Sequence, residues 1–458
     1  MTSVILRRLG GGKGEAFPGF LAGRIAPDLL PCLAKEVREG VIVILGTNGK
    51  TTTNNLLCHV LEAEGKKVLC NRSGANMRNG VTAAFVLAAD RRGRIDADYA
   101  CIEVDEFAAE DLLPALKPVC VVLTNIFRDQ LDRFGEIDAV CEKIRNALNR
   151  VPEAKVVFNC DDSLSASVCM AEMPGAGMAF RGERGGSFSG GKTTAFGVNE
   201  RLCGSAFGLA VREGTFCRFC GEKLEYAFYH YGQLGHYRCP GCSWERPVPD
   251  YAAEGVAFRD ESYRFFVDGL RVSVHTDALY NVYNTLSVYA ALKACAIEVG
   301  GFSGEVERFD FENRREETFW IRGARVRLFL AKNPVGFQQK MLIMMRDGRQ
   351  KDILLHIADT ARDGTDISWL WDVDFGYFAK MNAKTILTVG SRRLDMALRL
   401  KYEDISCRTV KGVTSAVRHL VRSGTGNLYI IVNYSGLFHI NRMLHRMSGS
   451  IPKKAKER

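Results

Sequence analysis

One stretch constrains the fold most strongly: a short apolar run followed by a glycine-bounded loop that contains lysine and threonine. Residues 41–45 read Val-Ile-Val-Ile-Leu, which is typical of a buried parallel strand. A helical pattern begins directly after the loop and continues to Glu64. Backbone N–H groups of such a loop and the helix N-terminus attract phosphate, lysine reaches its terminal oxygens, and a threonine hydroxyl ligates Mg²⁺. The loop therefore predicts an ATP site formed by Gly46, Thr47, Asn48, Gly49, Lys50, Thr51 and Thr52.

Strands and helices alternate around this loop, which predicts an α/β fold with a parallel sheet. Strands are expected at 67–70, 99–104 and 119–123, with helical patterns between them at 79–89 and 107–116. A second alternating region has strands predicted at 353–358, 385–389 and 428–432. Residues 181–205 are rich in Gly, Ser and Thr and are predicted to form a loop.

The length of 458 residues favours several domains rather than one. We expect a basic, helical N-terminal segment at 1–40 and a central ATP-binding domain at 41–310. A small insert is expected at 205–250 and a C-terminal α/β domain at 311–458.

A phosphate loop needs an acidic partner for its metal ion. Glu103 and Asp105 come at the end of the predicted strand 99–104, and Glu106 follows. Ligands of open α/β sheets bind at the carboxyl ends of the strands, so one of these carboxylates is placed to hold Mg²⁺. The alternative is that all three residues only cap the helix that follows. We take Glu103 as the predicted magnesium ligand, together with Thr51.

Four of the 15 cysteines form two Cys-x2-Cys pairs with 18 residues between them. This spacing is typical of a zinc ribbon, in which four thiolates surround one tetrahedral ion. With four protein ligands the predicted Zn²⁺ site is structural rather than catalytic. The alternative is a cysteine-rich segment without metal. The predicted ligands are Cys217, Cys220, Cys239 and Cys242.

Charge and hydropathy restrict the possible partners only loosely. The net charge of +9 allows an anionic partner such as a phosphorylated substrate or an acidic membrane surface. No apolar run is long enough to span a membrane, and the N-terminus lacks the apolar stretch of a signal peptide. We expect a cytoplasmic protein, with peripheral contact to the inner face of the cell membrane as a further possibility.

Several motifs together resemble the Mur ligase family. The shortened loop from Gly46 to Thr52 is one, and Thr124-Asn125-Ile126 is another. The helix containing Asn281 and Asn284 resembles the nucleotide-binding helix of these ligases. Arg315 resembles their interdomain arginine, and Lys332-Asn333-Pro334 stands where His-Asn-Pro is common. The resemblance implies a Mur-ligase-like ATPase domain in which Asn281, Asn284, Arg315 and Lys332 contribute to ATP binding.

Two features are similar to the MurT branch of this family. Only 45 residues precede the phosphate loop, fewer than the domain that holds UDP in other Mur ligases, and a four-cysteine segment is inserted. The string Asp363-Gly364-Thr365-Asp366-Ile367-Ser368-Trp369 also agrees. Members of this branch are synthetase subunits of lipid II isoglutaminyl synthases.

That resemblance implies a two-subunit amidotransferase. A GatD-like glutamine amidotransferase subunit would release ammonia, and this chain would use ATP to activate the α-carboxylate of D-glutamate in the lipid II stem peptide. An acyl phosphate and then D-isoglutamine would form. Lys50 and Glu103 would serve the phosphoryl transfer, and Asp366 would complete the catalytic Cys-His pair of the partner. ATP, Mg²⁺ and a structural Zn²⁺ are the implied cofactors.

Two other functions compete with this hypothesis. The chain could be an amino-acid-adding ligase of the muramyl or folylpolyglutamate type, which shares the ATP chemistry. It could instead be a nucleic-acid-dependent ATPase that reads its partner through the zinc ribbon. No basic face is evident around the cysteines, because Glu222, Glu225 and Glu245 accompany the arginines there. We therefore expect no nucleic acid partner.

Overall fold

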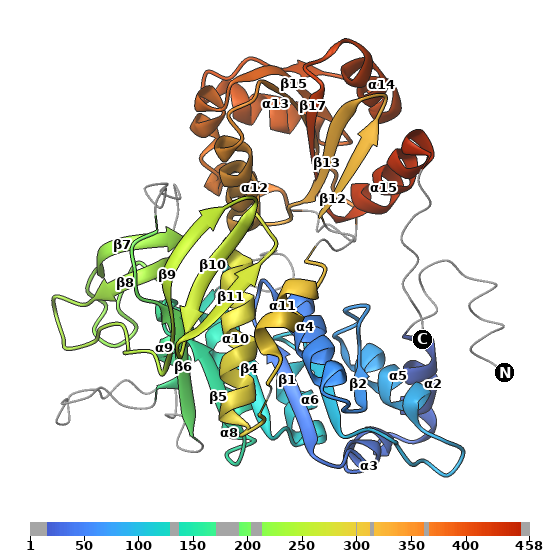
Figure 1. Cartoon of the computed structure of the whole chain (residues 1–458), viewed down its shortest axis with the longest axis vertical. Coiled ribbons are helices and arrows are strands. Elements are labelled where there is room, and N and C mark those ends of the chain that lie inside the picture. Colours follow the sequence, from blue (N-terminus) through green and yellow to red (C-terminus); the bar gives the residue numbers. More distant parts are fainter. Residues whose placement is uncertain are drawn as a thin grey trace. The chain divides into compact units, whose positions relative to one another are not determined.

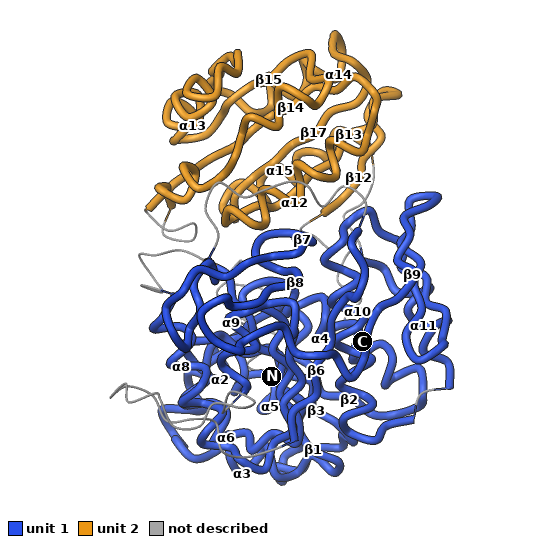
Figure 2. Tube along the Cα trace, turned by 90° about the vertical axis from the view of Figure 1, so that its left-hand side faces the viewer, with its two compact units in different colours: residues 1–127, 136–206, 213–311 blue, residues 128–135, 207–212, 312–458 orange. Residues whose placement is uncertain are grey.

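The computed structural model describes residues 16–128, 137–170, 192–202, 213–298, 300–311, 316–360 and 366–449. The chain divides into two compact units, coloured separately in Figure 2. Unit 1 comprises residues 1–127, 136–206 and 213–311, and unit 2 comprises residues 128–135, 207–212 and 312–458.

Unit 1 is built on a nine-stranded sheet with the order β11-β10-β9-β6-β5-β4-β1-β3-β2 (Figure 1). The strand before the phosphate loop, β1 (Gly40–Leu45), lies between its parallel neighbours β3 (Tyr99–Glu103) and β4 (Cys120–Leu123). Its residues from Val41 onward are buried, as expected for a strand covered on both faces. The remaining strands are β2 (Val68–Cys70), β5 (Lys155–Asn159), β6 (Thr193–Val198), β9 (Tyr251–Arg259), β10 (Ser262–Val267) and β11 (Leu270–Val274).

The helices of unit 1 cover this sheet. The helix after the phosphate loop, α4 (Lys50–Ala63), packs against α10 (Tyr280–Ala294). Most of α10 is buried because it also packs on β4, β5 and β6. The others are α2 (Phe17–Ile25), α3 (Leu29–Ala34), α5 (Arg78–Ala88), α6 (Ala109–Leu116), α8 (Ile137–Asn149), α9 (Ser163–Cys169) and α11 (Phe302–Arg308).

The cysteine-bearing segment contributes a separate two-stranded antiparallel hairpin to unit 1. Its strands are β7 (Glu225–Tyr231) and β8 (Leu234–Arg238). Two isolated bridges, Phe216 to Lys223 and Arg238 to Glu245, extend the pairing toward the two cysteine pairs.

Unit 2 has a six-stranded sheet with the order β12-β13-β17-β14-β15-β16. The pair β12–β13 is antiparallel and the other neighbours are parallel. Buried aliphatic side chains from β13, β14 and β17 form its core with helices α14 and α15. The elements are β12 (Glu316–Ile321), β13 (Ala324–Leu330), α12 (Pro334–Arg346), β14 (Lys351–His356), η1 (Ser368–Asp372), η2 (Phe375–Lys380), β15 (Ala383–Val389), α13 (Arg393–Lys401), β16 (Arg408–Thr409), α14 (Val413–Ser423), β17 (Asn427–Val432) and α15 (Tyr434–Ser448).

The predicted parallel α/β architecture is confirmed in both units. One prediction was wrong: residues 193–198 form β6, a strand in the interior of the sheet, and not a loop. The Gly, Ser and Thr content of residues 181–205 suggested a loop, but β6 pairs with β5 and β9 and its last four residues are buried. In the described part of the chain, no helix is long and apolar enough to cross a membrane.

Candidate nucleotide site and four-cysteine cluster

The phosphate loop turns sharply between β1 and α4 because two glycines take up left-handed backbone angles. The φ angles are +118° at Gly46 and +89° at Gly49. A side chain at Gly49 would also collide with the amide oxygen of Asn284. Both positions therefore require glycine for conformation and for space. The N-terminus of α4 begins at Lys50 and can accept an anion there.

Lys50 is held inside the loop by a buried ion pair. Its ammonium nitrogen donates to the Gly46 carbonyl oxygen at 2.5 Å and to Oε1 of Glu106 at 3.0 Å. Burial alone would lower the pKa of Lys50, but the charges of Glu106, Glu103 and Asp105 outweigh it and raise the pKa. Burial raises the pKa of Glu106 above its usual range, although Lys50 opposes the change. Lys50 is thus a charged group facing the loop, and Glu106 is its partner.

Thr51 and Glu103 meet at the carboxyl edge of the sheet. The hydroxyl of Thr51 donates to Oε2 of Glu103 at 2.7 Å, and the amide of Asn76 donates to Oε1 at 2.9 Å. Asn71 holds the backbone of Glu103 from both sides, donating to its carbonyl at 2.8 Å and accepting from its N–H at 2.9 Å. The carboxylate is therefore fixed next to the threonine hydroxyl, as a shared metal site requires.

The segment after β4 supports the back of the loop. The backbone N–H of Asn48 donates to Oδ1 of Asn125 at 2.9 Å, and the amide of Asn125 donates to the Asn48 carbonyl at 3.0 Å. Thr124 donates to the same carbonyl at 2.8 Å. The hydroxyl of Thr47 donates to the Phe127 carbonyl at 3.0 Å. Thr124 and Asn125 therefore hold the backbone of the loop at Asn48.

Asn281 and Asn284 lie on the buried face of α10, with Asn284 beside Gly49. The amide of Asn284 donates to Oδ1 of Asn281 at 3.0 Å, and Asn281 donates to Thr276 at 3.0 Å. Both are thus brought to the phosphate loop. Their contact with adenine or ribose stays a prediction.

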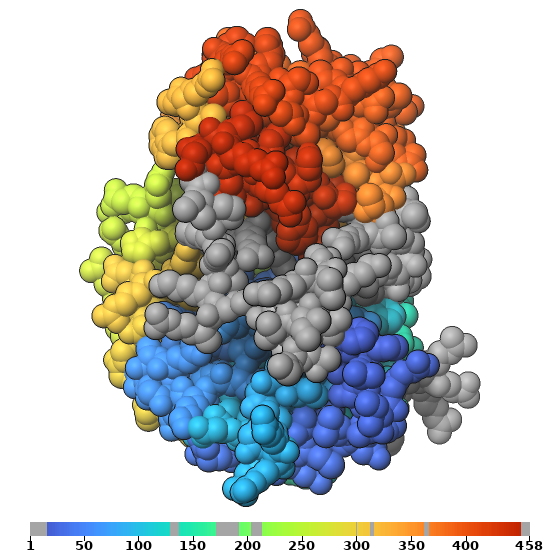
Figure 3. Space-filling model, turned by 90° about the vertical axis from the view of Figure 1, so that its right-hand side faces the viewer, coloured from blue at the N-terminus to red at the C-terminus, as the bar shows by residue number. Residues whose placement is uncertain are grey.

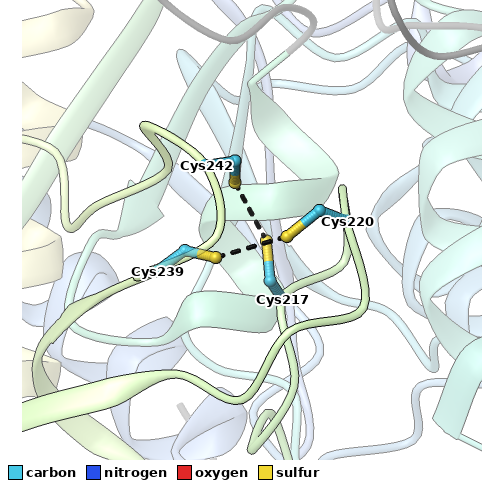
Figure 4. Close-up of side chains that lie close together, drawn as sticks. All are labelled: Cys217, Cys220, Cys239 and Cys242. Atoms are coloured by element: carbon cyan, nitrogen blue, oxygen red, sulfur yellow. Dashed lines mark hydrogen bonds between the residues drawn. The ribbon is translucent and has the colours of Figure 1, made fainter.

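The four cysteines of the predicted zinc site converge (Figure 4). Their sulfur atoms all lie within 4.8 Å of one another. The sulfur atoms of Cys217 and Cys242 are 3.6 Å apart, and those of Cys220 and Cys239 are 3.3 Å apart. Four thiolates on a tetrahedral Zn²⁺ at about 2.3 Å would stand about 3.8 Å apart. The cluster therefore fits such an ion.

A buried glutamine of the hairpin next to the cysteines bonds to the segment that supports the nucleotide site. The amide of Gln233, between β7 and β8, donates to the Ile126 carbonyl at 2.7 Å and to Oδ1 of Asp162 at 2.9 Å. The second oxygen of Asp162 accepts from the Ile126 N–H at 2.8 Å. Ile126 lies between Asn125 and Phe127, which hold the phosphate loop. Gln233 and Asp162 thus fix the segment that supports the loop.

A second buried polar cluster anchors the same hairpin. Oδ1 of Asp161 accepts from Nε of Arg246 at 2.6 Å, and Oδ2 accepts from the Tyr283 hydroxyl at 2.7 Å. His230 stands beside them, its Nε2 at 3.8 Å from Asp161. Burial lowers the pKa of His230 to about 4 against the opposing charge of Asp161, so the ring is neutral at physiological pH.

The other three predicted residues lie in unit 2 or outside the described residues. Asp366 lies in unit 2, where its two oxygens accept from the backbone N–H of Ser368 at 2.7 Å and from its hydroxyl at 2.9 Å. Asp366 thus lies just before the short helix η1 and bonds to its first residue. Lys332, also in unit 2, follows β13 and precedes the α12 cap residue Asn333. Arg315 lies outside the described residues.

Two family models match the chain. Residues 44–184 match the Mur ligase middle domain, and residues 330–437 match the MurT ligase C-terminal domain. A lipid II isoglutaminyl synthase (glutamine-hydrolyzing) subunit MurT from Streptococcus pneumoniae is 29% identical over 97% of this chain and 94% of its own length. The same-named subunit from Staphylococcus aureus is 29% identical over 86% of this chain and 84% of its own length.

The chain is a MurT homologue. Its Mur ligase middle domain makes it an ATP-dependent ligase. The match to the Mur ligase middle domain begins at Ile44 and includes the phosphate loop and Glu103. Asp366 falls within the match to the MurT ligase C-terminal domain.

Solved structures agree on the fold. A pseudomurein peptide ligase type C from Methanothermus fervidus superposes with a TM-score of 0.65 at 19% identity, covering 90% of this chain and 79% of that one. MurF from Acinetobacter baumannii also gives a TM-score of 0.65, at 15% identity, covering 92% of this chain and 79% of that one. The chain therefore has the Mur ligase fold.

Some residues that organise the site were not predicted from the sequence. Asn71 directly follows β2, so the rule that ligands gather at the carboxyl ends of parallel strands would have indicated it. Gln233 gave no such signal, because a glutamine in a hairpin turn is usually exposed.

Proposed function

We propose that the chain is the synthetase subunit of a lipid II isoglutaminyl synthase. It would convert the α-carboxylate of D-glutamate in the lipid II stem peptide to the carboxamide of D-isoglutamine, with ammonia from a GatD-like subunit. The observation that carries the proposal is the similarity, over almost the whole chain, to subunits that bear this name. The match of residues 330–437 to the MurT ligase C-terminal domain supports it further.

The chemistry requires that a carboxylate become an electrophile. A carboxylate oxygen would attack the γ-phosphorus of ATP, ADP would leave, and an acyl phosphate would form. Ammonia would then attack the acyl carbon, lose a proton and expel phosphate. Positioning and charge neutralisation are the main tasks of the protein in such a transfer. The charged Lys50 at the loop fits this task because its ammonium lies at the N-terminus of α4.

Thr51 and Glu103 are the residues that would hold Mg²⁺. Their hydroxyl and carboxylate oxygens are 2.7 Å apart, and both are hard donors of the kind that this ion prefers. When bound, Mg²⁺ supplies positive charge next to the phosphoryl oxygens. Asn76 and Asn71 would keep the Glu103 carboxylate in place with or without the bound ion.

Asn281, Asn284, Arg315 and Lys332 are proposed to complete ATP binding. Support for the two asparagines comes from the position of Asn284 beside Gly49. Arg315 and Lys332 are assigned by motif alone.

Zn²⁺ is proposed to bind Cys217, Cys220, Cys239 and Cys242. It would fix the fold of this segment, because four thiolates fill the coordination sphere and leave no open position. The spacing of the four sulfur atoms supports this assignment.

Unit 2 is proposed to bind the glutaminase, with Asp366 completing the partner's catalytic pair. Unit 2 carries a set of exposed apolar side chains. One of them, Trp371 of η1, is close to Asp366 in sequence. The other members of this set repeat every four residues along and just after α13: Leu394, Leu398 and Tyr402 are 63%, 49% and 70% exposed. The rings of Trp371 and Tyr402 stand 5.2 Å apart. Exposed apolar groups of this kind mark protein interfaces.

The test is mass spectrometry of a D-glutamate-containing lipid II stem after incubation with this chain and Mg-ATP. One arm supplies ammonium salt at mildly alkaline pH, and another supplies glutamine with a candidate glutaminase. We expect conversion of carboxylate to carboxamide in both arms. Incorporation of an added amino acid would instead favour an amino-acid-adding ligase. This alternative is considered because a UDP-N-acetylmuramoylalanine–D-glutamate ligase from Chlorobium limicola is 26% identical over 76% of this chain.

A further inference from the structure

The helix α10 ends in a way that holds Cys295 at a defined place. The N–H of Ala296 donates to the Lys293 carbonyl at 3.0 Å, and the backbone of Ala296 has a left-handed φ of +57°. The N–H of Ile297 donates to the Leu292 carbonyl at 2.9 Å. These two bonds form the Schellman arrangement, which stops a helix sharply. Cys295 is the cap residue of this helix end, so its backbone is fixed by the turn.

This end of α10 meets the first residues of two strands of the sheet. The helix packs on β4 and β5 (Figure 1). Cys120 and Lys155 begin these strands and are direct partners in the parallel pairing, so their side chains point to the same face. The ammonium nitrogen of Lys155 donates to the Ala294 carbonyl oxygen at 2.7 Å, so this face is the one that α10 covers. The register and this bond therefore bring Cys120 and Cys295 together beside Lys155.

The two thiols differ in their access to solvent. They share a hydrogen bond, but Cys120 is fully buried whereas Cys295 is partly exposed. The chain continues from Cys295 through the exposed Ala296 to α11, which lies at the surface of unit 1 (gold in Figure 3). An accessible thiol next to a second thiol is the arrangement of a redox-sensitive pair, in which the first thiol reacts and the second resolves the product.

The charges around the pair favour Cys295 as the thiol that reacts first. The hydrogen bond from Cys120 and the positive charge of Lys155 lower the pKa of Cys295, although burial opposes them. The same hydrogen bond and complete burial raise the pKa of Cys120 well above its usual range. A helix C-terminus by itself disfavours a thiolate, but here Lys155 binds a terminal carbonyl and offsets its partial charge. Since the thiolate is the nucleophile, Cys295 would attack an oxidant and Cys120 would follow.

We propose that Cys295 and Cys120 form a peroxide-sensitive dithiol that closes to a disulfide. The thiolate of Cys295 attacks hydrogen peroxide: an S–O bond forms, the O–O bond breaks, and the departing hydroxide takes up the proton that Cys295 had lost. The sulfur of Cys120 then attacks the sulfenic sulfur: the S–S bond forms, the S–O bond breaks, and the second hydroxide leaves as water with the proton of Cys120. One peroxide thus oxidises two thiols and yields two waters. The disulfide would fasten the last turn of α10 to β4.

Peptide mass spectrometry of the full chain tests the proposal. After treatment with hydrogen peroxide and digestion without reductant, we expect a peptide pair joined through Cys120 and Cys295, which dithiothreitol separates. In Cys120→Ser, dimedone should trap a sulfenic acid at Cys295; in Cys295→Ser, it should trap none at Cys120. Cys407→Ser is the matched control, because Cys407 is also partly exposed but lies in unit 2 and burial raises its pKa. This variant should form the disulfide as the parent chain does.

A second measurement needs no substitution. Iodoacetamide at about pH 7 should label Cys295 of the parent chain at least about tenfold faster than Cys407, because alkylation follows the thiolate. Equal labelling rates, a sulfenic acid that forms first at Cys120, or a disulfide from Cys295 to the neighbouring Cys101 would overturn the proposal. Neither measurement uses ATP, a substrate or a glutaminase, so the result is independent of the proposed function.

Discussion

The strongest test of the link between the cysteine-bearing hairpin and the nucleotide site is Gln233→Leu. Leucine has a similar size but cannot donate a hydrogen bond. The Ile126 carbonyl therefore loses its bond of 2.7 Å, and Oδ1 of Asp162 loses its bond of 2.9 Å. Gln233 is 1% exposed, so water cannot replace the lost donor. Leaving two buried acceptors unsatisfied costs about 1–3 kcal/mol each. Asp162 keeps its bonds to Ser165 and to the Ile126 N–H, so the total should be about 2–4 kcal/mol.

Part of this cost should appear as weaker nucleotide binding. The freed Ile126 segment carries Asn125 and Phe127, which bind the backbone of Asn48 and the hydroxyl of Thr47. We expect the Kd for ADP to rise about tenfold, equivalent to about 1.4 kcal/mol. Urea unfolding measures the stability, and isothermal titration calorimetry measures the Kd.

A matched control separates general destabilisation from an effect on the site. Ser167→Ala removes a buried hydrogen bond of 2.8 Å to the Leu164 carbonyl, within α9. It should lower stability by about 1 kcal/mol and leave the Kd unchanged. If Gln233→Leu lowers stability but binds ADP as tightly as the parent chain, the proposed support of the loop is wrong.

Three further predictions concern single residues. Lys50→Met should lower kcat at least about 100-fold, because it removes a charge aimed at the phosphates. The substitution leaves Glu106 without its ion-pair partner. The loss of stability should nevertheless be small, because burial raises the pKa of Glu106 and favours its protonation. Denaturant melts and steady-state kinetics check both parts. Asp366→Asn should abolish glutamine-dependent amidation and keep ammonia-dependent amidation, because asparagine still accepts from the Ser368 N–H; equal loss in both assays would contradict the role in the partner's site. Stability should fall as the pH drops from about 6.5 to about 4, because the unfolded chain binds a proton on His230 that the folded chain excludes. The full loss is about 3 kcal/mol, and unfolding of His230→Phe should lose this part of the pH dependence.

The phosphate site could be predicted because its signal is local. The strand, the loop and the first turn of α4 are consecutive, so Gly46, Lys50 and Thr51 must lie together wherever the rest of the chain goes. Glu103 could be added because β3 is parallel to β1, and the ends of parallel strands meet at one edge. The four cysteines were predictable for the same reason, since each pair is a local turn and the two pairs flank one hairpin.

The strand β6 was not predictable from its own residues. Thr193–Val198 contains a glycine and follows a stretch rich in glycine and serine, so local composition favours a loop. It becomes a strand because β5 and β9 offer hydrogen bonds on both sides and because its last four residues are buried. Strand propensity depends on such neighbours more than on the segment itself.

The residues that hydrogen-bond around the site also depend on neighbours that are distant in sequence. Asn71, Asn125 and Gln233 are neutral polar residues in loops, and composition cannot separate them from solvated ones. Each matters because a segment distant in sequence presents an unpaired backbone group: Glu103 to Asn71, Asn48 to Asn125, and Ile126 to Gln233. The catalytic charges are therefore set by a local motif, whereas their positions are set by amides from distant loops. The hairpin that bears Gln233 belongs to the cysteine-bearing segment, so this segment contributes one of these amides to the support of the phosphate loop.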